Sequence, residues 1–137
     1  MTREPGVVRV TAMVVSDEHR RALVVRKVGA SVFQQPGGKP DVGETALQTG
    51  LRELAEETGL VVDPADALAL GTFTDAAANE PGHVVIAEAF AVRVSGVTAV
   101  ASAEIAELRW ILESEVDATP LAPLSRNHLI RHAWRDA

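Results

Sequence analysis

Residues 45–60 carry the strongest periodic pattern in the chain and predict an amphipathic α-helix of about thirteen residues. Thr45 can cap the first turn, because Gln48 three residues later completes a capping box. Gly59 suits the left-handed conformation that ends a helix, and Leu60 can pack back on the last turn. The helix needs a partner surface for its apolar stripe. The stripe recurs at i, i+4, i+7 and i+11: Leu47, Leu51, Leu54 and Thr58.

Five segments predict β-strands, because β-branched and apolar residues dominate each of them. A polar turn separates the first two, which predicts a strand pair. The fourth is apolar almost throughout, which predicts a central strand with both faces covered. The five segments are residues 7–15, 21–28, 68–74, 84–94 and 105–112.

The end of the chain, residues 122–137, predicts a second amphipathic helix. Its inner side would carry Leu129, Ile130, Ala133 and Trp134. Strands before, between and after two helices predict an α/β fold in which a mixed sheet has helices on both faces.

The composition is that of a globular domain, with 47% hydrophobic and 23% charged residues in a chain of 137. A formal net charge of −6 argues against broad nucleic-acid binding, which needs a basic surface, but permits a small phosphorylated ligand held by a metal ion and one or two cations. The absence of cysteine excludes disulfides and thiolate metal sites. With neither a signal peptide nor an apolar run of about 18 residues, we expect one cytoplasmic domain over residues 1–137 that makes no membrane contact.

Three glutamates, Glu53, Glu56 and Glu57, gather within an arc of about 100° on the side of the predicted helix away from the leucines. Their mutual repulsion should cost a few tenths of a kcal/mol per pair in water. Two interpretations account for such a cluster. It is either a solvated acidic face with scattered Arg partners, or a site for a hard divalent cation such as Mg²⁺, which prefers carboxylate and carbonyl oxygens.

Two neighbouring features favour the cation. Gly50 shares a stripe with Glu53 and Glu57, although a mid-helix Gly costs about 1 kcal/mol relative to Ala, which indicates that something approaches the helix closely. Residues 31–44 contain two prolines and three glycines and predict a loop. The PGGK sequence in this loop supplies bare backbone and Lys39, one of two lysines in the chain. Glycines, a cation and an acidic face together suit a polyphosphate.

The segment GKPDVGETALQTGLRELAEETGL, residues 38–60, resembles the Nudix box of the Nudix hydrolase family, G-x5-E-x7-R-E-U-x-E-E-x-G-U with U aliphatic. Its seven fixed identities would coincide by chance on the order of once in 10⁸ to 10⁹ windows. The preceding QQPGGK resembles the start of the box in MutT-like members. Every defined position matches: Gly38, Glu44, Arg52, Glu53, Leu54, Glu56, Glu57, Gly59 and Leu60.

The resemblance implies an α/β/α sandwich in which the box forms a loop–helix–loop. It also implies hydrolysis of a nucleoside diphosphate linked to another group, with Mg²⁺ or Mn²⁺ as the cofactor. Arg52 and Glu44 would be structural, and helical geometry lets Arg52 pair with Glu44 or Glu56. The implied metal ligands are a backbone carbonyl of Gly37 or Gly38 and the side chains of Glu53, Glu56 and Glu57.

The candidates for substrate binding lie mostly outside the box. Arg26 and Lys27 end a predicted strand beside the glycine loop, where they are either solvated or bind the α- or β-phosphate, as cations do in MutT-like proteins. Lys39 is a further cation for the polyphosphate. Phe33 is the aromatic residue best placed to contact a base. Asn127 is a candidate to hydrogen-bond a purine edge, as a C-terminal Asn does in MutT-like proteins.

The predicted catalytic residues are acidic. Glu53 is the first choice as general base because it shares the stripe of small residues, and Glu56 belongs to the same acid set. Glu104 is the second choice, since many family members recruit an acidic ligand or base from outside the box. Glu107 and Glu80 compete with Glu104 for that role.

Two further polar features have open interpretations. Glu88 lies in an apolar strand, where an unpaired carboxylate is unfavourable, so it should either pair with an arginine such as Arg93 or Arg109 or face the active cleft. His128 and His132 have the i, i+4 spacing of a zinc site, but without an evident third ligand a solvent-facing position is favoured.

The predicted function is that of a Mg²⁺-dependent pyrophosphohydrolase that converts a nucleoside triphosphate, including an oxidised one, to a nucleoside monophosphate and pyrophosphate. One alternative is a pyrophosphatase for ADP-ribose or another nucleotide sugar. Another is a sensor domain that binds a nucleotide without turning it over. The expected partner is a small nucleotide rather than an extended nucleic acid, and the sequence predicts no oligomeric state.

Overall fold

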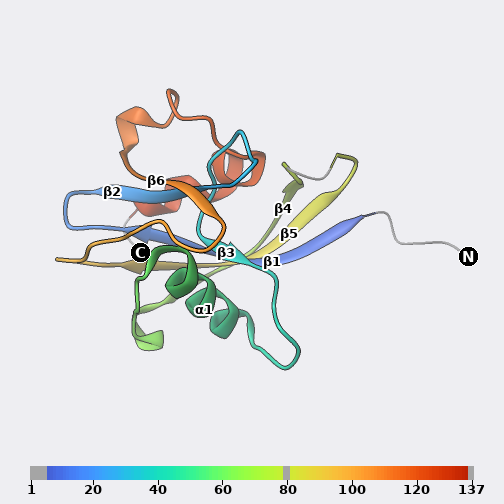
Figure 1. Cartoon of the computed structure of the whole chain (residues 1–137), viewed down its shortest axis with the longest axis horizontal. Coiled ribbons are helices and arrows are strands. Elements are labelled where there is room, and N and C mark those ends of the chain that lie inside the picture. Colours follow the sequence, from blue (N-terminus) through green and yellow to red (C-terminus); the bar gives the residue numbers. More distant parts are fainter. Residues whose placement is uncertain (1–5, 79–80, 136–137) are drawn as a thin grey trace, which may run out of the picture.

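The computed structural model describes residues 6–78 and 81–135, and within them six strands form one mixed sheet (Figure 1). The strand order is β4-β5-β1-β2-β6, and β3 pairs with β1 outside this row. β1 and β5 are parallel along the whole of β1, whereas the other pairings are antiparallel. The predicted mixed sheet is thus confirmed. Its strands are β1 (Val7–Ser16), β2 (Arg21–Lys27), β3 (Gly37–Gly38), β4 (Leu68–Ala76), β5 (Val84–Arg93) and β6 (Ile105–Leu112).

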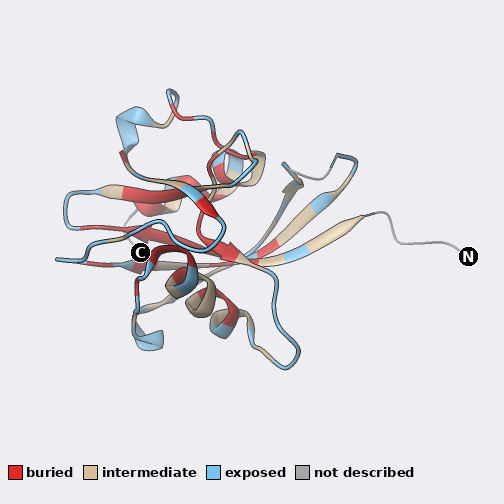
Figure 2. Ribbon diagram, in the orientation of Figure 1, coloured by how far each residue is buried: buried red, intermediate tan, exposed pale blue. Residues whose placement is uncertain are grey.

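Helical elements cover both faces of the sheet, which confirms the predicted α/β/α sandwich (Figure 1). Alternate side chains of β1 point to opposite faces. Ala12 and Val14 therefore join the core beneath the C-terminal segment (residues 121–135), while Met13 and Val15 join the core beneath α1. Figure 2 shows the buried residues concentrated between these layers. The helical elements are α1 (Ala46–Thr58), η1 (Pro64–Asp66), η2 (Glu113–Glu115), η3 (Ser125–Leu129) and η4 (Ile130–Ala133).

The ends of α1 follow the sequence signals. The backbone N–H of Gln48 donates to the Thr45 hydroxyl at 3.1 Å, and the backbone N–H of Thr45 donates to the Gln48 side chain at 2.9 Å, which forms the predicted capping box. Gly59 ends the helix in the left-handed region with φ of 76°. Leu60 is buried in the same cluster as Leu54, as expected.

The close approach predicted at Gly50 is real, but the neighbour is the sheet rather than a ligand. A Cβ atom added to Gly50 would overlap Met13 Sδ and lie 2.8 Å from Thr11 Cγ2. Gly50 therefore lets α1 pack closely on β1. This packing fixes the position of the acidic side chains that follow along the helix.

The C-terminal segment is less regular than the predicted helix. A wide π-helical turn in η3 is followed by a tight 3-10 turn in η4, and residues 136–137 lie outside the described part of the chain. The predicted inner side is nevertheless confirmed, because its four side chains are all buried. They are Leu129, Ile130, Ala133 and Trp134.

One end of the sheet is only partly covered, as Figure 2 shows for the start of β1 and for β4 and β5. β5 has a neighbour on each side, but the prediction that both its faces are covered is wrong for its first half. Val84 and Glu88 are exposed, because α1 and the C-terminal segment reach only the later part of the strand. No helix in the described ranges is long and apolar enough to cross a membrane.

Candidate active site

A cleft of about 560 Å³ lies where α1, β3, the end of β2 and the loop before β6 come together. Part of the C-terminal segment closes its other side. The glycine turn and the three glutamates of α1 all line this cleft, so the structure brings together the residues that the box predicted. Its charged lining consists of Lys27, Lys39, Asp41, Arg52, Glu53, Glu56, Glu57 and Glu104.

The glycine turn holds bare backbone against both β1 and α1. Gly37 and Gly38 form the short strand β3, which pairs with β1. A Cβ atom on Gly37 would overlap the carbonyl oxygen of Thr11, and one on Gly38 would overlap the carboxylate of Glu53. The N–H of Gly37 also donates to Glu57 Oε1 at 3.1 Å. Glycine is therefore required at position 37, where the contact is with fixed backbone, while a side chain at position 38 would displace the Glu53 carboxylate.

Glu57 is the most deeply buried carboxylate of the cluster, with 5% of the residue exposed. Burial raises its pKa to about 7, against the opposing effects of the Gly37 N–H and the Lys27 ammonium. The charges of Glu53 and Glu104 raise it further. A carboxyl group in this position gains strongly from a nearby positive charge.

Glu53 is held in a similar environment. Burial raises its pKa, and the adjacent Glu56 carboxyl acts in the same direction, while the Arg52 guanidinium opposes both. Arg52 Nη1 donates to Glu53 at 3.1 Å and to Glu56 at 3.5 Å. Two of the three glutamates of α1 are thus oriented by one arginine.

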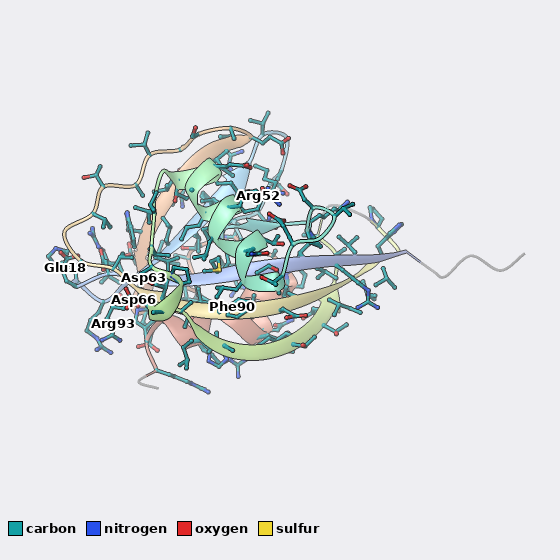
Figure 3. The ribbon with its side chains drawn as sticks, turned by 90° about the horizontal axis from the view of Figure 1, so that it is seen from below. Glu18, Arg52, Asp63, Asp66, Phe90 and Arg93 are labelled. Carbon is teal, nitrogen blue, oxygen red and sulfur yellow. The ribbon has the colours of Figure 1, made fainter. Side chains whose placement is uncertain are left out.

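Hydrogen bonds also fix the other side of the Arg52 guanidinium; Figure 3 labels Arg52 on α1. Its Nε and Nη2 atoms donate to the two oxygens of Glu44 at 2.7 and 3.0 Å, a bidentate pairing, and Nη2 also donates to the carbonyl of Lys39 at 3.1 Å. The Arg52 guanidinium lowers the pKa of Glu44 to about 2. The expected pairing of Arg52 with Glu44 and Glu56 is confirmed, and it ties the loop before α1 to the glutamates.

The donor atoms of the cluster suit a hard cation, but they are not arranged around one. In the part of the chain that the structure describes, no three Asp, Glu, His or Cys side chains are grouped as a metal site. Glu56 is half exposed and Glu53 is paired with Arg52, so both would have to turn to join Glu57. Carboxylate oxygens are donors of the type that Mg²⁺ and Mn²⁺ bind, and a bound cation would offset the repulsion between the glutamates.

Three predicted residues outside the helix also line the cleft: Lys27, Lys39 and Glu104. Glu104 is exposed, and the loop that carries it is fixed to the end of α1, because the N–H of Ser102 donates to the carbonyl of Glu57 at 3.0 Å. The N–H of Val28 donates to the Glu104 carbonyl at 2.8 Å. These bonds hold Lys27 and Glu104 on the rim beside the glutamates.

Three other predicted residues do not line the cleft. Phe33 is 1% exposed and packs in the core, so it has no face free for a base. Arg26 donates to the carbonyl of Ala30 at 3.1 Å and to Glu107 at 3.4 Å, and it lies over the Phe33 ring rather than beside the glutamates. Asn127 is exposed and donates to Asp75 at 2.8 Å. The structure therefore does not support the predicted substrate contacts of Phe33, Arg26 and Asn127.

The remaining acidic candidates are also placed. Glu107 pairs with Arg109 at 2.9 Å and does not line the cleft, and Glu80 lies outside the described residues. Glu88 is exposed and lines a separate shallow depression with Arg9. The expectation that Glu88 faces the active cleft is therefore wrong.

In the described residues, the two histidines are not grouped with further His, Cys, Asp or Glu side chains as a metal site. His128 Nε2 lies 3.3 Å from Asp75 Oδ2, and both His128 and His132 pack against the Phe73 ring. Burial lowers the pKa of His132, and the neighbouring charges of Arg135 and Arg131 add to this effect. The two rings are therefore partly buried rather than simply solvent-facing.

The structure adds cleft residues that were not predicted. Gln35 and Ser125 are buried and line the cleft, together with several aliphatic side chains of β1, β5 and the C-terminal segment. One signal for Ser125 was available in the sequence. It shares an i, i+4, i+8 stripe with Leu129 and Ala133, so a polar residue stands on an otherwise apolar inner side.

The family model of the NUDIX domain matches residues 6–132 of the chain. The chain therefore belongs to the NUDIX family. The match covers the sheet, α1 and most of the C-terminal segment, and so includes all of the cleft-lining residues.

Among curated proteins, the chain is similar to one from Mycobacterium tuberculosis (strain CDC 1551 / Oshkosh), provisionally named 8-oxo-dGTP diphosphatase 3. The two are 34% identical over 88 residues, which is 64% of this chain but 41% of the relative. The match thus spans about two fifths of the relative's length.

Two solved structures share the fold. A MutT protein from Methanosarcina mazei Go1 has a TM-score of 0.77 at 19% identity and covers 96% of both chains. The NUDIX domain of Shewanella oneidensis NrtR, solved with ADP ribose, has a TM-score of 0.77 at 21% identity and covers 96% of this chain and 88% of that one.

Proposed function

We propose that this protein is a pyrophosphohydrolase, dependent on Mg²⁺ or Mn²⁺, that cleaves a nucleoside triphosphate to a nucleoside monophosphate and pyrophosphate. The observation that carries the proposal is the composition of the cleft. The carboxylates of α1, of which Glu57 is buried, share the cleft with two lysines, and the remaining described lining is largely neutral and aliphatic. Such a cleft is complementary to a molecule with a polyphosphate at one end and an uncharged ring at the other.

The three box glutamates are the proposed metal ligands. Glu57 is held in place by the Gly37 N–H, while Glu53 and Glu56 are held by Arg52, and all three would supply carboxylate oxygens to the cation. A bound Mg²⁺ neutralises phosphate charge and lowers the pKa of the attacking water. The glycine turn lines the cleft with bare backbone, which could supply a carbonyl ligand to the cation.

Glu53 is the proposed general base. In the metal-free protein, burial and the neighbouring Glu56 carboxyl raise its pKa, and the carboxylate lines the cleft against the Gly38 backbone. The proton moves from the attacking water to the Glu53 carboxylate, the water oxygen bonds to phosphorus, and the P–O bond of the anhydride breaks. Glu104, on the rim of the cleft, is the second proposed base.

Two cations are proposed to hold the phosphate chain. Lys27 and Lys39 both line the cleft. In the sequence, Lys27 comes before the glycine turn and Lys39 after it, and both precede α1. Their charges offset those of phosphate oxygens that do not contact metal. Arg52 is excluded from this role because its guanidinium is occupied by Glu44 and the Lys39 carbonyl.

The triphosphate is favoured over a nucleotide sugar by the provisional name of the Mycobacterium tuberculosis relative, an 8-oxo-dGTP diphosphatase. The ADP ribose bound to the Shewanella oneidensis domain belongs to a structure that shares the fold at 21% identity, so ADP ribose serves as the comparison substrate. An oxidised purine triphosphate is included in the proposal alongside the common ones.

The test is a panel of substrates incubated with Mg²⁺, with the products separated by chromatography. The panel contains the common nucleoside triphosphates, 8-oxo-dGTP and ADP ribose. We expect monophosphate and pyrophosphate in equal amounts from at least one triphosphate, and faster than cleavage of ADP ribose. Tight binding without turnover of any compound would support a sensor domain instead and would overturn the proposal.

A further inference from the structure

The cleft has a second half that takes no part in the proposed phosphate chemistry. Its charged lining residues lie on α1, on the loops before α1 and β6, and at the end of β2. Among the described residues, those that line the half between the start of β1, the start of β5 and the C-terminal segment are uncharged. Its walls are aliphatic: Val8, Val10, Val85, Leu124 and Leu129. An uncharged part of a ligand is favoured there.

Two buried polar side chains line the same cleft without a partner. Within residues 6–78 and 81–135, the buried side-chain nitrogen and oxygen atoms that make no hydrogen bond are Nε2 and Oε1 of Gln35 and Oγ of Ser125. Gln35 is 4% exposed and Ser125 is 1% exposed. Buried polar groups nearly always have hydrogen-bond partners, so three atoms in one cleft without a partner in the chain require partners from outside it, either a ligand or ordered water.

We infer that Gln35 and Ser125 hydrogen-bond the edge of the nucleobase and thereby set the base preference of the protein. The inference rests on the proposed function, because it takes the ligand to be a nucleotide with its phosphates at the glutamates. A Gln amide presents a donor and an acceptor side by side, which matches a base edge that carries an adjacent acceptor and donor. The Ser hydroxyl adds one more donor or acceptor.

The faces of the base contact aliphatic side chains rather than an aromatic ring. Among the residues described, no Phe or Trp lines the cleft, and Phe33 is buried in the core beside it. Base selectivity therefore depends on the hydrogen bonds of Gln35 and Ser125 more than on stacking. Stacking is tolerant of sequence because every base has a π-face, whereas hydrogen bonds distinguish one base edge from another.

The C-terminal segment contributes Ser125 to this recognition rather than Asn127. The Asn127 amide is exposed and already donates to Asp75. Ser125 instead lies on the inner stripe of the segment with Leu129, where its buried hydroxyl has no hydrogen-bond partner among the described residues. The alternative is that one or two ordered waters satisfy Gln35 and Ser125 without any role in binding.

The test is calorimetric binding of AMP, GMP, CMP and UMP, in the presence of Mg²⁺, to the wild type, Gln35→Met and Ser125→Ala. Met keeps the length of Gln without its hydrogen bonds. We expect the affinity for the preferred base to fall about 10- to 100-fold in Gln35→Met and about 3- to 10-fold in Ser125→Ala. The affinity for the weakest base should change much less. Ser114 is an exposed serine outside the cleft, so Ser114→Ala is the matched control. It should leave unchanged the ratio of the affinities for the preferred and the weakest base.

Thermal stability and kinetics separate recognition from a structural role. Both cleft variants replace an unpaired buried polar group by an apolar one, so their melting temperatures should equal or exceed that of the wild type. With a triphosphate of the preferred base, KM should rise while kcat changes little. If Gln35→Met fails to fold, Ser125→Ala carries the same test.

The outcomes distinguish this inference from the proposed function. An unchanged base ratio in the folded variants, or a wild type that binds all four bases equally, would mean that water alone satisfies these atoms, and the inference would be overturned. Failure of the proposed function looks different. In that case the wild type binds one base selectively but releases no pyrophosphate from any triphosphate.

Discussion

Replacing Glu57 by Gln should stabilise the metal-free protein at alkaline pH. Glu57 is 5% exposed, and burial raises its pKa to about 7, compared with the ordinary value of 4.5. At about 1.4 kcal/mol per pH unit, this difference corresponds to roughly 3 kcal/mol of lost stability once the group is ionised. A Gln of the same shape carries no charge, so the variant avoids this loss.

The pH range follows from the sign of the linkage. Between pH 4.5 and about 7 the unfolded state has released the proton of Glu57 while the folded state still holds it. Folding then takes up a proton, so the free energy of unfolding falls as the pH rises through this range. Above about pH 7 both states are ionised and the contribution of Glu57 no longer changes.

The assay is urea unfolding of the wild type and Glu57→Gln at pH 5 and pH 8, with a chelator present. We expect the variant to gain about 2–3 kcal/mol relative to the wild type between the two values of pH. Glu113→Gln, at an exposed position on η2, is the control and should show no such gain. Equal pH dependence in Glu57→Gln and the wild type would refute the idea that a buried, repelled carboxylate stands at this site.

Three further variants test the surroundings of the site. Arg52→Lys keeps the charge but loses the bidentate pairing with Glu44, so kcat/KM for a triphosphate should fall about 10- to 100-fold in steady-state assays. Wild-type kinetics would count against an orienting role for Arg52. Gly38→Ala places a Cβ atom against the movable carboxylate of Glu53, so activity should fall more than melting temperature, and a fully active variant would contradict this. Phe33→Leu should lower the free energy of unfolding by roughly 1–3 kcal/mol in denaturant and leave KM unchanged. A raised KM at wild-type stability would instead support the predicted contact between Phe33 and the base.

The elements governed by local signals were predictable from the sequence. The capping box of Thr45 and the left-handed position of Gly59 act within a few residues, so α1 could be bounded before its surroundings were known. The same holds for the glutamates, since helical geometry alone places Glu53, Glu56 and Glu57 on one side. The sheet followed from the alternation of strands and helices.

Features that depend on tertiary contacts were not predictable. Phe33 is beside the glycine loop in sequence, but the extended chain there turns its ring into the core, a direction that neighbouring residues do not reveal. The glycine at position 50 indicated that another group lies close to the helix, but the sequence did not show that this group is Met13 of β1. Gln35 gave no periodic signal at all, because its significance lies in the absence of a partner across the fold.

Dependence of turnover on both the glutamates and the metal is the most direct test of the central claim, namely that the acidic side of α1 is a metal-dependent catalytic site. The measurement is pyrophosphate release from the best triphosphate by the wild type, Glu53→Gln and Glu57→Gln, each with Mg²⁺ and with chelator. We expect the wild type to be active only with Mg²⁺ and each variant to lose about 10²- to 10⁴-fold in kcat, the range expected for loss of a general base or of a metal ligand. Turnover at the wild-type rate by both variants, or by the wild type with chelator, would mean that the three glutamates form a solvated acidic face and nothing more.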